Sequence, residues 1–345
     1  MKYLPRRWTY PPIANNSGGI FILTLWAIFF LSTLAVMLGY QIRQKLTLLG
    51  RIEERDKLRY VAEAGVRKTI CDILKDKERL RYALKDCVEG ELALFKEVAF
   101  GDGVYDISYE YPDDQTGSLK TYYGPLDEER KININKASMP VMRRFFRYLL
   151  AIDEVEAQDV AASIVDWRDS DSDLSVPLGS AEDSYYRNLP VPYEAKDANF
   201  ETLSELLLVK GVTPKIFERV KPYLTIYGDG RVNVNTAPKA VLAAFGLPES
   251  AVDKILAYRR GRDGVDGTTD DNVFQAAGDI AGLGGDFRLT DAESAKAREV
   301  CEQYLTVNSY NFMIRSAASL KNKKYKVEAV GVVDNNGKIL SWQET

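Results

Sequence analysis

Residues 19–38 read GIFILTLWAIFFLSTLAVML, a run without a single charged side chain. The uncharged stretch continues on both sides, from Arg7 to Arg43. Twenty helical residues rise about 30 Å, which is the thickness of the hydrocarbon core of a bilayer. We therefore expect a membrane-spanning helix. The side chains assigned to it include Leu23, Leu25, Trp26 and Leu31.

The flanking residues predict the orientation of this helix. Lys2, Arg6 and Arg7 precede it, so the positive-inside rule places the N-terminus in the cytoplasm and the rest of the chain across the membrane. A cleaved secretory signal also has basic residues before an apolar core. Its core is usually shorter, however, and no A-x-A cleavage site follows here.

The helical pattern continues without proline to about residue 75. Apolar residues recur there at helical spacing, at Ile42, Leu46, Leu49, Leu58, Ala62, Val66, Ile70 and Ile73. The simplest interpretation is one helix over residues 19–75, apolar at its start and amphipathic afterwards. A plain anchor followed by a separate surface helix is the alternative.

Composition bounds the functions that the chain can have. Its 345 residues are enough for two or three domains, and a net charge of −4 gives no global attraction to nucleic acid. The chain has no histidine, which excludes Ser-His and Cys-His catalysis and histidine-bearing metal sites. Cys71, Cys87 and Cys301 are too few and too scattered for a zinc motif. Two could pair in an oxidising compartment, or all three could be isolated thiols.

An internal repeat organises the middle of the chain. Lys131–Val141 reads KININKASMPV and Arg231–Val241 reads RVNVNTAPKAV, one hundred residues later. A second match pairs VAASIVDWRD, from Val160, with VDKILAYRRG, from Val252. Asn, Ser and Thr before apolar runs are helix-start signals. The sequence predicts an all-helical domain over residues 131–301, in which the repeat is structural.

Strand-like sequence flanks this helical domain on both sides. GVYDISYEY and LKTYYG precede it, and YLTVNSYNFMIRSAAS, KYKVEAVGVV and ILSWQ follow it. Each group alone is too small to be stable, so we expect the two groups to share one sheet. The predicted fold is α+β: a long N-terminal helix packs on an antiparallel sheet, and the helical domain is inserted into the connections of the sheet.

An acidic cluster follows the first predicted helix pair of that domain. Its candidate metal ligands are Asp166, Asp169, Asp171, Asp173 and Glu182. Carboxylates at such spacing repel one another, and a calcium ion, which accepts six to eight oxygen ligands, removes the repulsion. The D-x-D-x-D spacing resembles part of an EF-hand loop, but the glycine and the final glutamate of that motif do not follow in register. A solvated acidic loop is the alternative.

Three alternative interpretations of the sequence are a second metal site, an enzyme and a DNA-binding protein. A second acidic loop, with Asp263, Asp266, Asp270 and Asp271, is rich in glycine, which favours a turn over a metal site. Clustered aspartates on a loop do not indicate an enzyme, because general acid–base catalysis needs two carboxyls held apart in a cleft. LLLVKGVT, residues 206–213, resembles a helix-hairpin-helix, which makes a membrane-anchored DNA-binding protein the alternative function. No basic stripe surrounds that turn, so we expect no nucleic-acid ligand.

The N-terminus resembles that of the type IV prepilins. A short basic leader ends in Asn-Ser-Gly-Gly, and the apolar helix begins at once. In that family a membrane peptidase cuts after a glycine. A cut after Gly18 would make Gly19 the first mature residue and Leu23 the fifth, where most family members carry glutamate. A cut after Gly19 would place Thr24 there. A subunit without this carboxylate suits the tip of a fibre, where no subunit lies ahead of it.

The ordered set of motifs over nearly the whole mature chain resembles the K-type minor pseudopilins of the bacterial type II secretion system. These motifs are GGIFILTLWAIFFLSTLA, AEAGVRKTI, LDEERKININKAS, SIVDWRDSDSD, GSAEDSYYRNLP, FETLSELLLVKGV, RVNVNTAPKAVLAAFGL and the strand-rich tail. The resemblance implies a type IV pilin-like fold with an inserted domain of the SAM or helix-hairpin-helix kind. It also implies calcium bound around the DW-x-D-x-D and G-x-E-D motifs.

The resemblance further implies the role, location and partners. The protein would be a non-enzymatic subunit at the pseudopilus tip, in the inner membrane of a Gram-negative cell, with most of its chain in the periplasm. It would join minor pseudopilins I and J and prime assembly of the major pseudopilin G, after processing by the prepilin peptidase, and would take no small-molecule substrate. The expected segments are a leader (1–18), the N-terminal helix (19–75), a pilin-like part (76–130), the inserted helical domain (131–301) and C-terminal strands (302–345).

Overall fold

The computed structural model describes residues 17–75, 83–84, 92–114, 116–320 and 325–345. The chain divides into two units, Met1–Lys57 and Leu58–Thr345. The predicted leader, residues 1–18, falls almost wholly outside the described residues, and Cys87 lies outside them. Cys71 and Cys301 are both free thiols, the first exposed and the second buried.

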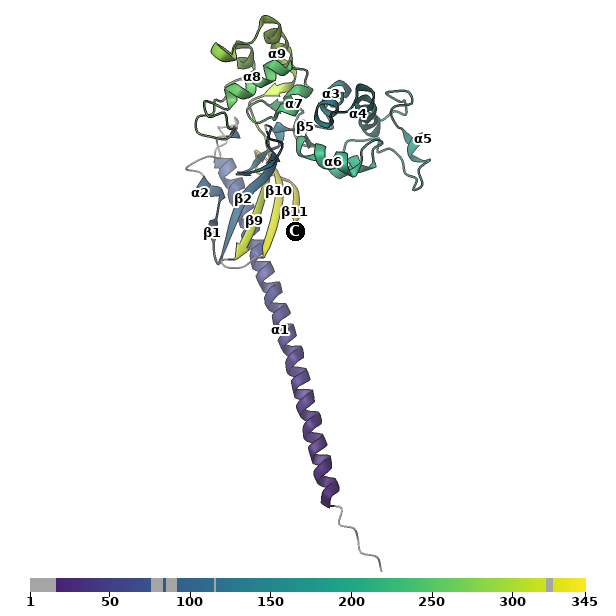
Figure 1. Ribbon diagram of the computed structural model, residues 1–345, viewed down its shortest axis with the longest axis vertical. Coiled ribbons are helices and arrows are strands. Elements are labelled where there is room, and N and C mark those ends of the chain that lie inside the picture. Colours follow the sequence, from purple (N-terminus) through teal and green to yellow (C-terminus); the bar gives the residue numbers. More distant parts are fainter. Residues whose placement is uncertain (1–16, 76–82, 85–91, 115, 321–324) are drawn as a thin grey trace, which may run out of the picture. The chain divides into compact units, whose positions relative to one another are not determined.

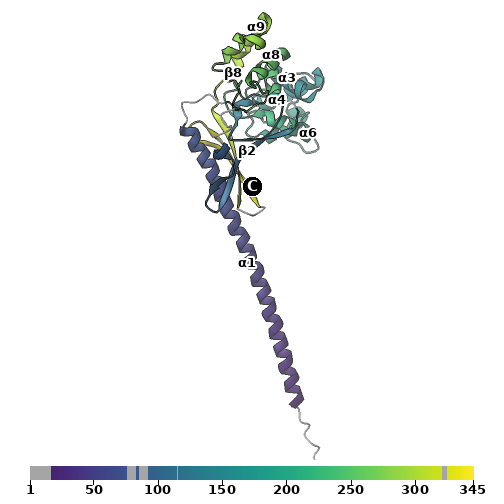
Figure 2. The same ribbon diagram turned by 60° about the vertical axis from the view of Figure 1, so that its left-hand side comes forward.

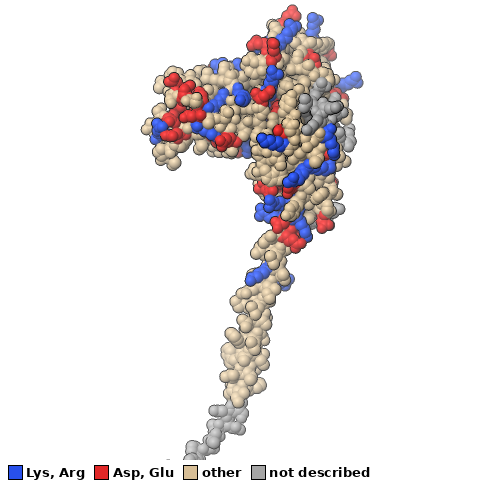
Figure 3. Space-filling model, turned by 180° about the vertical axis from the view of Figure 1, so that it is seen from behind, with Lys and Arg blue, Asp and Glu red and all other residues tan. Residues whose placement is uncertain are grey.

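The first long helix is α1, Ser17–Lys75. Its part within the first unit has exposed side chains from Gly19 to Leu49, and Figure 3 shows this stretch free of charged atoms as far as the first basic side chains. The helix contains a segment apolar and long enough to cross a membrane. The single long helix expected from the sequence is therefore present and fits a single-pass anchor.

The second unit contains an antiparallel sheet that joins the two predicted groups of strands (Figure 1). The strands before the helical stretch are β1 (Val98–Phe100), β2 (Gly103–Pro112), β3 (Leu119–Tyr123) and β4 (Leu126–Asp127), with α2 (Leu92–Phe95) preceding them. Those after it are β9 (Asn311–Leu320), β10 (Lys326–Asp334) and β11 (Ile339–Glu344). The central order is β1-β2-β9-β10-β11, so β2 and β9 join the two groups. The α+β class expected from the sequence is confirmed.

The part of α1 in this unit packs on the sheet through the predicted apolar face. Leu58, Ala62 and Val66 form a core with Ile107 of β2 and Ile314 of β9. Gly65 lies on the same helical face, and a Cβ built there would come within 2.8 Å of a Tyr105 ring atom. A glycine at this position thus allows the backbone of the helix to approach β2 closely.

The helical elements lie between β4 and β9 and form two groups (Figures 1 and 2). The first comprises β5 (Ile132–Asn133), α3 (Met139–Leu150), α4 (Glu154–Arg168), α5 (Asp183–Tyr186), η3 (Leu203–Leu208), α6 (Pro214–Val220), η4 (Lys221–Tyr223) and β6 (Leu224–Thr225). The second comprises β7 (Val232–Asn233), α7 (Lys239–Ala244), α8 (Glu249–Arg259), η5 (Ala277–Gly282), η6 (Gly285–Phe287), α9 (Asp291–Tyr304) and β8 (Leu305–Thr306). Each group is closed by a short parallel pair, β5 with β6 and β7 with β8.

The asparagines of the sequence repeat have the same bonds in both groups. Asn135 exchanges two hydrogen bonds with the backbone of Phe200, of 2.8 and 3.0 Å. Asn235 does the same with Phe274, at 2.9 and 3.1 Å. These side chains hold the start of each repeat against the segment that precedes η3 in the first group and η5 in the second. The interpretation of the repeat as structural thus has a physical basis.

The predicted alignment of the segment from Val160 with the segment from Val252 is wrong by one residue. Matching Val160 with Val252 sets Arg168 opposite Arg260. In the structure Arg168 donates to the carbonyl oxygens of Ile134 and Ala137, and Arg259 donates to those of Val234 and Ala237. Arg168 therefore corresponds to Arg259. Two consecutive arginines at 259 and 260 made the register ambiguous in the sequence alone.

Three consecutive acidic side chains, beginning with the last residue of β4, fasten the helical groups to the sheet. Asp127 accepts hydrogen bonds from Asn233 and Thr236, at the start of the second group. Glu128 accepts one from Thr225, at the end of the first group, and pairs with Lys131 at 2.6 Å. Glu129, in η2 (Glu128–Arg130), accepts two backbone N–H bonds of 3.0 Å where the chain re-enters the sheet at β9. The stretch LDEER is thus the joint between sheet and helices.

We expect this joint to weaken as pH rises. Burial and the adjacent Asp127 carboxylate raise the pKa of Glu129 to about 8, against the N–H bonds it accepts, which lower it. A pKa raised above its unfolded value gives stability that is present below pH ~4.5 and lost as pH rises through ~8. Glu129→Gln should therefore flatten the decline in unfolding free energy between pH 5 and 9, by roughly 2–4 kcal/mol. Denaturant melts across that range measure it, and an identical pH slope in wild type and variant would contradict it.

Candidate metal centre

The acidic cluster is built where one helix ends and the next begins. Asp166 lies in the last turn of α4, and Asp169 is the C-cap residue of that helix, with its N–H on Val165 O at 3.0 Å. A loop then leads to Glu182, the N-cap residue of α5. Asp166 and Glu182 are sixteen positions apart in the sequence. The end of α4 and the start of α5 bring them into the same cluster.

Three of the predicted ligands come together. Carboxylate oxygens of Asp169, Asp171 and Glu182 all lie within 4.8 Å of one another. Glu182 is buried, Asp169 is half-buried and Asp171 is exposed, so the group opens to solvent on one side. Oδ1 of Asp169 and Oε1 of Glu182 are buried and have no hydrogen-bond partner. Buried carboxylate oxygens without donors are costly, and a bound cation would remove that cost.

The electrostatics of the cluster agree with this geometry. Burial, followed by the charges of Asp171 and Asp166, raises the pKa of Asp169 to about 6. Burial, followed by Asp166 and Asp169, raises the pKa of Glu182 to about 7. Arg168 is the neighbouring cation, but its guanidinium donates to two backbone carbonyls of the repeat. Arg168 lowers the pKa of Asp169 only in part, and within the described residues no ion pair neutralises the carboxylates, which therefore repel one another.

Asp166 and Asp173 have different positions from the other three. Asp166 is fully buried, and both of its oxygens accept the N–H of Ser175 at 3.2 and 3.3 Å, which holds the loop against α4. Its charge still reaches Asp169 and Glu182. Asp173 donates its N–H to Asp171 Oδ1 at 2.9 Å, and its carboxylate lies outside the close group of three. Both remain predicted ligands.

Asp197 is a further member of the cluster that the sequence did not reveal. Its charge raises the pKa values of both Asp169 and Glu182, so it lies near the same group. Its N–H donates to Trp167 O at 3.1 Å, and its backbone has a φ of 50°. No motif or spacing links Asp197 to the loop, because it follows a separate proline-containing segment. Trp167 itself is buried against Tyr186.

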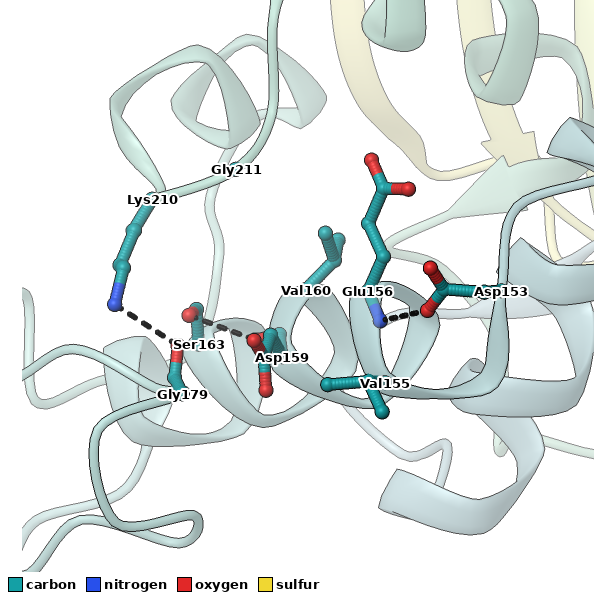
Figure 4. A pocket seen from close by; sticks show the side chains of 9 residues that line it. All are labelled: Asp153, Val155, Glu156, Asp159, Val160, Ser163, Gly179, Lys210 and Gly211. Carbon is teal, nitrogen blue, oxygen red and sulfur yellow. Dashed lines mark hydrogen bonds between the residues drawn. The ribbon is translucent and has the colours of Figure 1, made fainter.

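The far side of the acidic loop is held by a lysine (Figure 4). Lys210 donates its ammonium group to the carbonyl oxygens of Gly179 and Ser180, at 2.9 and 3.2 Å. Gly179 has no room for a side chain, since a Cβ built there would lie 2.7 Å from Val176. The turn that resembled a helix-hairpin-helix therefore positions the loop next to Glu182.

The surroundings of that turn do not suit nucleic acid. A pocket of about 340 Å³ adjoins it, lined by Asp153, Glu156 and Asp159 as well as Lys210 (Figure 4). Carboxylates beside a phosphate-binding turn would repel the phosphate, and Figure 3 shows further acidic side chains gathered on this part of the molecule. The ammonium of Lys210 is already used by the loop carbonyls.

The second acidic loop has internal counter-charges instead. Asp266 pairs with both Arg259 and Arg260 at 3.0 Å, and these arginines lower its pKa to about 2 despite its burial. Asp270 accepts bonds from Thr268 and from the backbone of Arg262, which lower its pKa to about 2. In the second repeat, Arg259 and Arg260 therefore lie next to the acidic loop, whereas in the first repeat the corresponding region holds a group of carboxylates. This favours the turn interpretation for residues 263–271.

The acidic cluster of Asp169, Asp171 and Glu182 fits a hard divalent cation. Its donors in the described part of the chain are carboxylate oxygens, two of them orphaned, and calcium prefers oxygen ligands in a flexible arrangement. Asp169, Asp171 and Glu182 would hold the ion, next to Asp166 and Asp197. Its chemical contribution there would be positive charge that joins the end of α4 to the start of α5.

The fold and this site define a class of protein: a pilin-like fold with an apolar N-terminal helix, an antiparallel sheet and a helical insertion that carries an acidic loop. Residues 124–229 match the family model for type II secretion system protein K. The chain carries this K domain, and its resemblance to the K-type minor pseudopilins is confirmed.

Individual relatives agree with this assignment. The chain is 32% identical over 129 residues to type II secretion system protein K of Aeromonas hydrophila and 30% identical over 136 residues to that of Pseudomonas aeruginosa. These alignments cover 35% and 39% of this chain, and only 38% and 40% of the relatives. The chain thus matches about two fifths of the length of these relatives.

A solved structure shows the same fold over more of the chain. It is a chain of the GspK–GspI–GspJ complex from enterotoxigenic Escherichia coli, with a TM-score of 0.64 and 15% identity. The superposition covers 86% of this chain and 99% of that one. At this identity the likeness concerns the fold.

Proposed function

We propose that this protein is a non-enzymatic minor pseudopilin that forms the tip of a type II secretion pseudopilus. In this proposal it assembles with minor pseudopilins I and J and primes polymerisation of the major pseudopilin G. It then caps the fibre and takes no small-molecule substrate. The fold neighbour comes from a structure of GspK with GspI and GspJ, which supports this choice of partners.

The position of the helical insertion on the sheet carries the proposal. The chain leaves the sheet at β4 and returns at β9, and these two strands pair at Asp127 and Phe312. The C-terminal part of α1 reaches the same end, because Ile70 and Leu74 approach Gly337 in the β10–β11 turn. The insertion therefore occupies the end of the sheet that lies next to the C-terminal end of α1. A subunit stacked beyond that end would meet the helical groups.

The N-terminal helix provides the anchor and the fibre contact in this account. Lys2, Arg6 and Arg7 keep the N-terminus in the cytoplasm, so the second unit faces the periplasm of a Gram-negative cell. The prepilin peptidase removes the leader after Gly18. Leu23 then takes the fifth position, where a carboxylate would need a partner from a subunit ahead, because an unpaired charge in lipid is costly. A tip subunit has no such partner.

Calcium has a supporting role in the proposal. Bound by the acidic loop, it fixes the junction of α4 and α5 and so keeps the first helical group rigid. DNA binding through residues 206–213 is the rejected alternative, since three carboxylates line the adjoining pocket.

Copurification with the partners tests the proposed function. The full chain in detergent, mixed with tagged minor pseudopilins I and J, should elute with both as one complex of defined stoichiometry. A version lacking residues 131–301 is not a suitable control, because Glu128 and Asp127 would lose their buried partners. Copurification with the major pseudopilin along whole fibres, but not with I and J, would refute the tip assignment.

A further inference from the structure

The joint between the sheet and the helices contains a buried arginine, two of whose nitrogen donors have no hydrogen-bond partner. Arg130, the last residue of η2, is 4% exposed, and its Nε and Nη1 have no hydrogen-bond partner. Its guanidinium carbon lies 3.7 Å from the centroid of the Tyr111 ring. Its neighbours Asp127, Glu128 and Glu129 all have partners, as described above. Arg130 is therefore the exception in an otherwise fully bonded turn.

A second unused donor lies beside the first. Tyr111, on β2, is only 2% exposed, and its hydroxyl group is also buried without a hydrogen-bond partner. Tyr223, on η4, closes the cluster with its ring edge-on to Tyr111, at 5.6 Å between centroids. A strand of the sheet, the joint and the first helical group thus meet around these donors.

Asp114 does not neutralise Arg130. Asp114 lies within electrostatic range of the guanidinium, but it accepts the backbone N–H of Lys239 at 2.9 Å and faces Arg260 at 3.7 Å. No carboxylate in the described ranges comes within 4.0 Å of Arg130, the distance that defines an ion pair. A buried guanidinium without a counter-charge is strongly unfavourable.

We propose that Arg130 and the Tyr111 hydroxyl bind a small monovalent inorganic anion of the chloride class. The N–H groups of Arg130 and the O–H of Tyr111 donate to it, and its charge compensates the buried guanidinium. A water molecule would accept these bonds but would leave the charge uncompensated. Because both residues are almost fully buried, a carboxylate of a partner protein could not reach them. The anion would strengthen the joint between β2 and the helical groups.

Anion exchange at constant ionic strength tests the site. The full chain in detergent, with calcium supplied as gluconate, is melted in sodium chloride, sodium bromide and sodium gluconate. Chloride and bromide should raise the melting temperature over gluconate by about 2–4 °C at a concentration ten times the dissociation constant. The shift should grow with the logarithm of chloride concentration.

Variants separate this site from general salt effects. Tyr111→Phe keeps the ring under Arg130 and should reduce the chloride shift several-fold, and Arg130→Met should abolish it. Arg219→Met is the matched control, because Arg219 donates to Leu149 O on an exposed surface, and it should keep the full shift. If Arg130→Met does not fold, line broadening of ³⁵Cl⁻ by wild type and its reduction in Tyr111→Phe decide the question. Equal melts of wild type in chloride and gluconate, or a full shift in Tyr111→Phe, would overturn the proposal.

Discussion

Removing calcium from the full chain in detergent should lower its melting temperature by roughly 5–15 °C. A ligand that binds only the folded state stabilises it in proportion to the logarithm of its concentration over its dissociation constant. Without the ion, the carboxylates of Asp169, Asp171 and Glu182 repel one another within 4.8 Å. Two of their oxygens would also stay buried without a donor. The measurement is a thermal melt with excess calcium and then with excess chelator.

Two variants make this result specific to the acidic loop. Asp169→Asn combined with Glu182→Gln should lower the melting temperature in calcium and remove most of the response to the chelator. Asp263→Asn, in the second acidic loop, should leave the response unchanged, because the acids there are bonded to arginine and backbone groups. A chelator response that persists in the double variant would place the calcium elsewhere, and no response in wild type would dismiss the site.

Replacing Gly18 and Gly19 by valine should abolish leader removal and, with it, protein secretion. An uncut leader keeps Lys2, Arg6 and Arg7 on the cytoplasmic side, and pulling these charges through lipid costs several kcal/mol each. The apolar helix could then not leave the bilayer to join a fibre. The length of the chain in membranes, read by immunoblot or mass spectrometry, reports cleavage, and the secreted enzymes of the cell report function.

A glycine elsewhere in the same helix provides the control. A Cβ built on Gly39 meets nothing within 4 Å, so Gly39→Val should be cut and should support secretion. A chain of mature length from the Gly18/Gly19 variant would show that the leader assignment is wrong.

Much of the fold could be predicted because its signals are local. The apolar run and the spacing from Leu58 to Ile70 predicted α1 almost to its ends, and the alternating strand patterns predicted β2, β9 and β10. The pairing of strands more than two hundred residues apart followed from stability, since neither group could form a sheet alone.

The parts that could not be predicted depend on contacts between distant residues. Asp197 lies near the acidic loop, but nothing in its neighbourhood marks it as part of a site. Asn135 and Asn235 were recognised as a repeat, yet their partners Phe200 and Phe274 follow only from the packed structure. The one-residue error at Arg260 arose because either of two adjacent arginines fits the pattern, and only hydrogen-bond geometry distinguishes them.

The chemistry of buried acids shows the same limit. In LDEERK the sequence shows only a charged turn. The structure shows that each of its three acids fastens a different segment, and that burial raises the pKa of Glu129 to about 8. Desolvation depends on every neighbour of a group, so such a shift cannot be read from local composition.

The position of the protein in assembled fibres tests the capping claim most directly. Fibres formed with the major pseudopilin and minor pseudopilins I and J can be imaged by electron microscopy with a gold-labelled antibody fragment against the helical groups. Our account predicts label at one end of each fibre and none along its length. Label at regular intervals along the fibre, with subunits on both sides of it, would contradict the account.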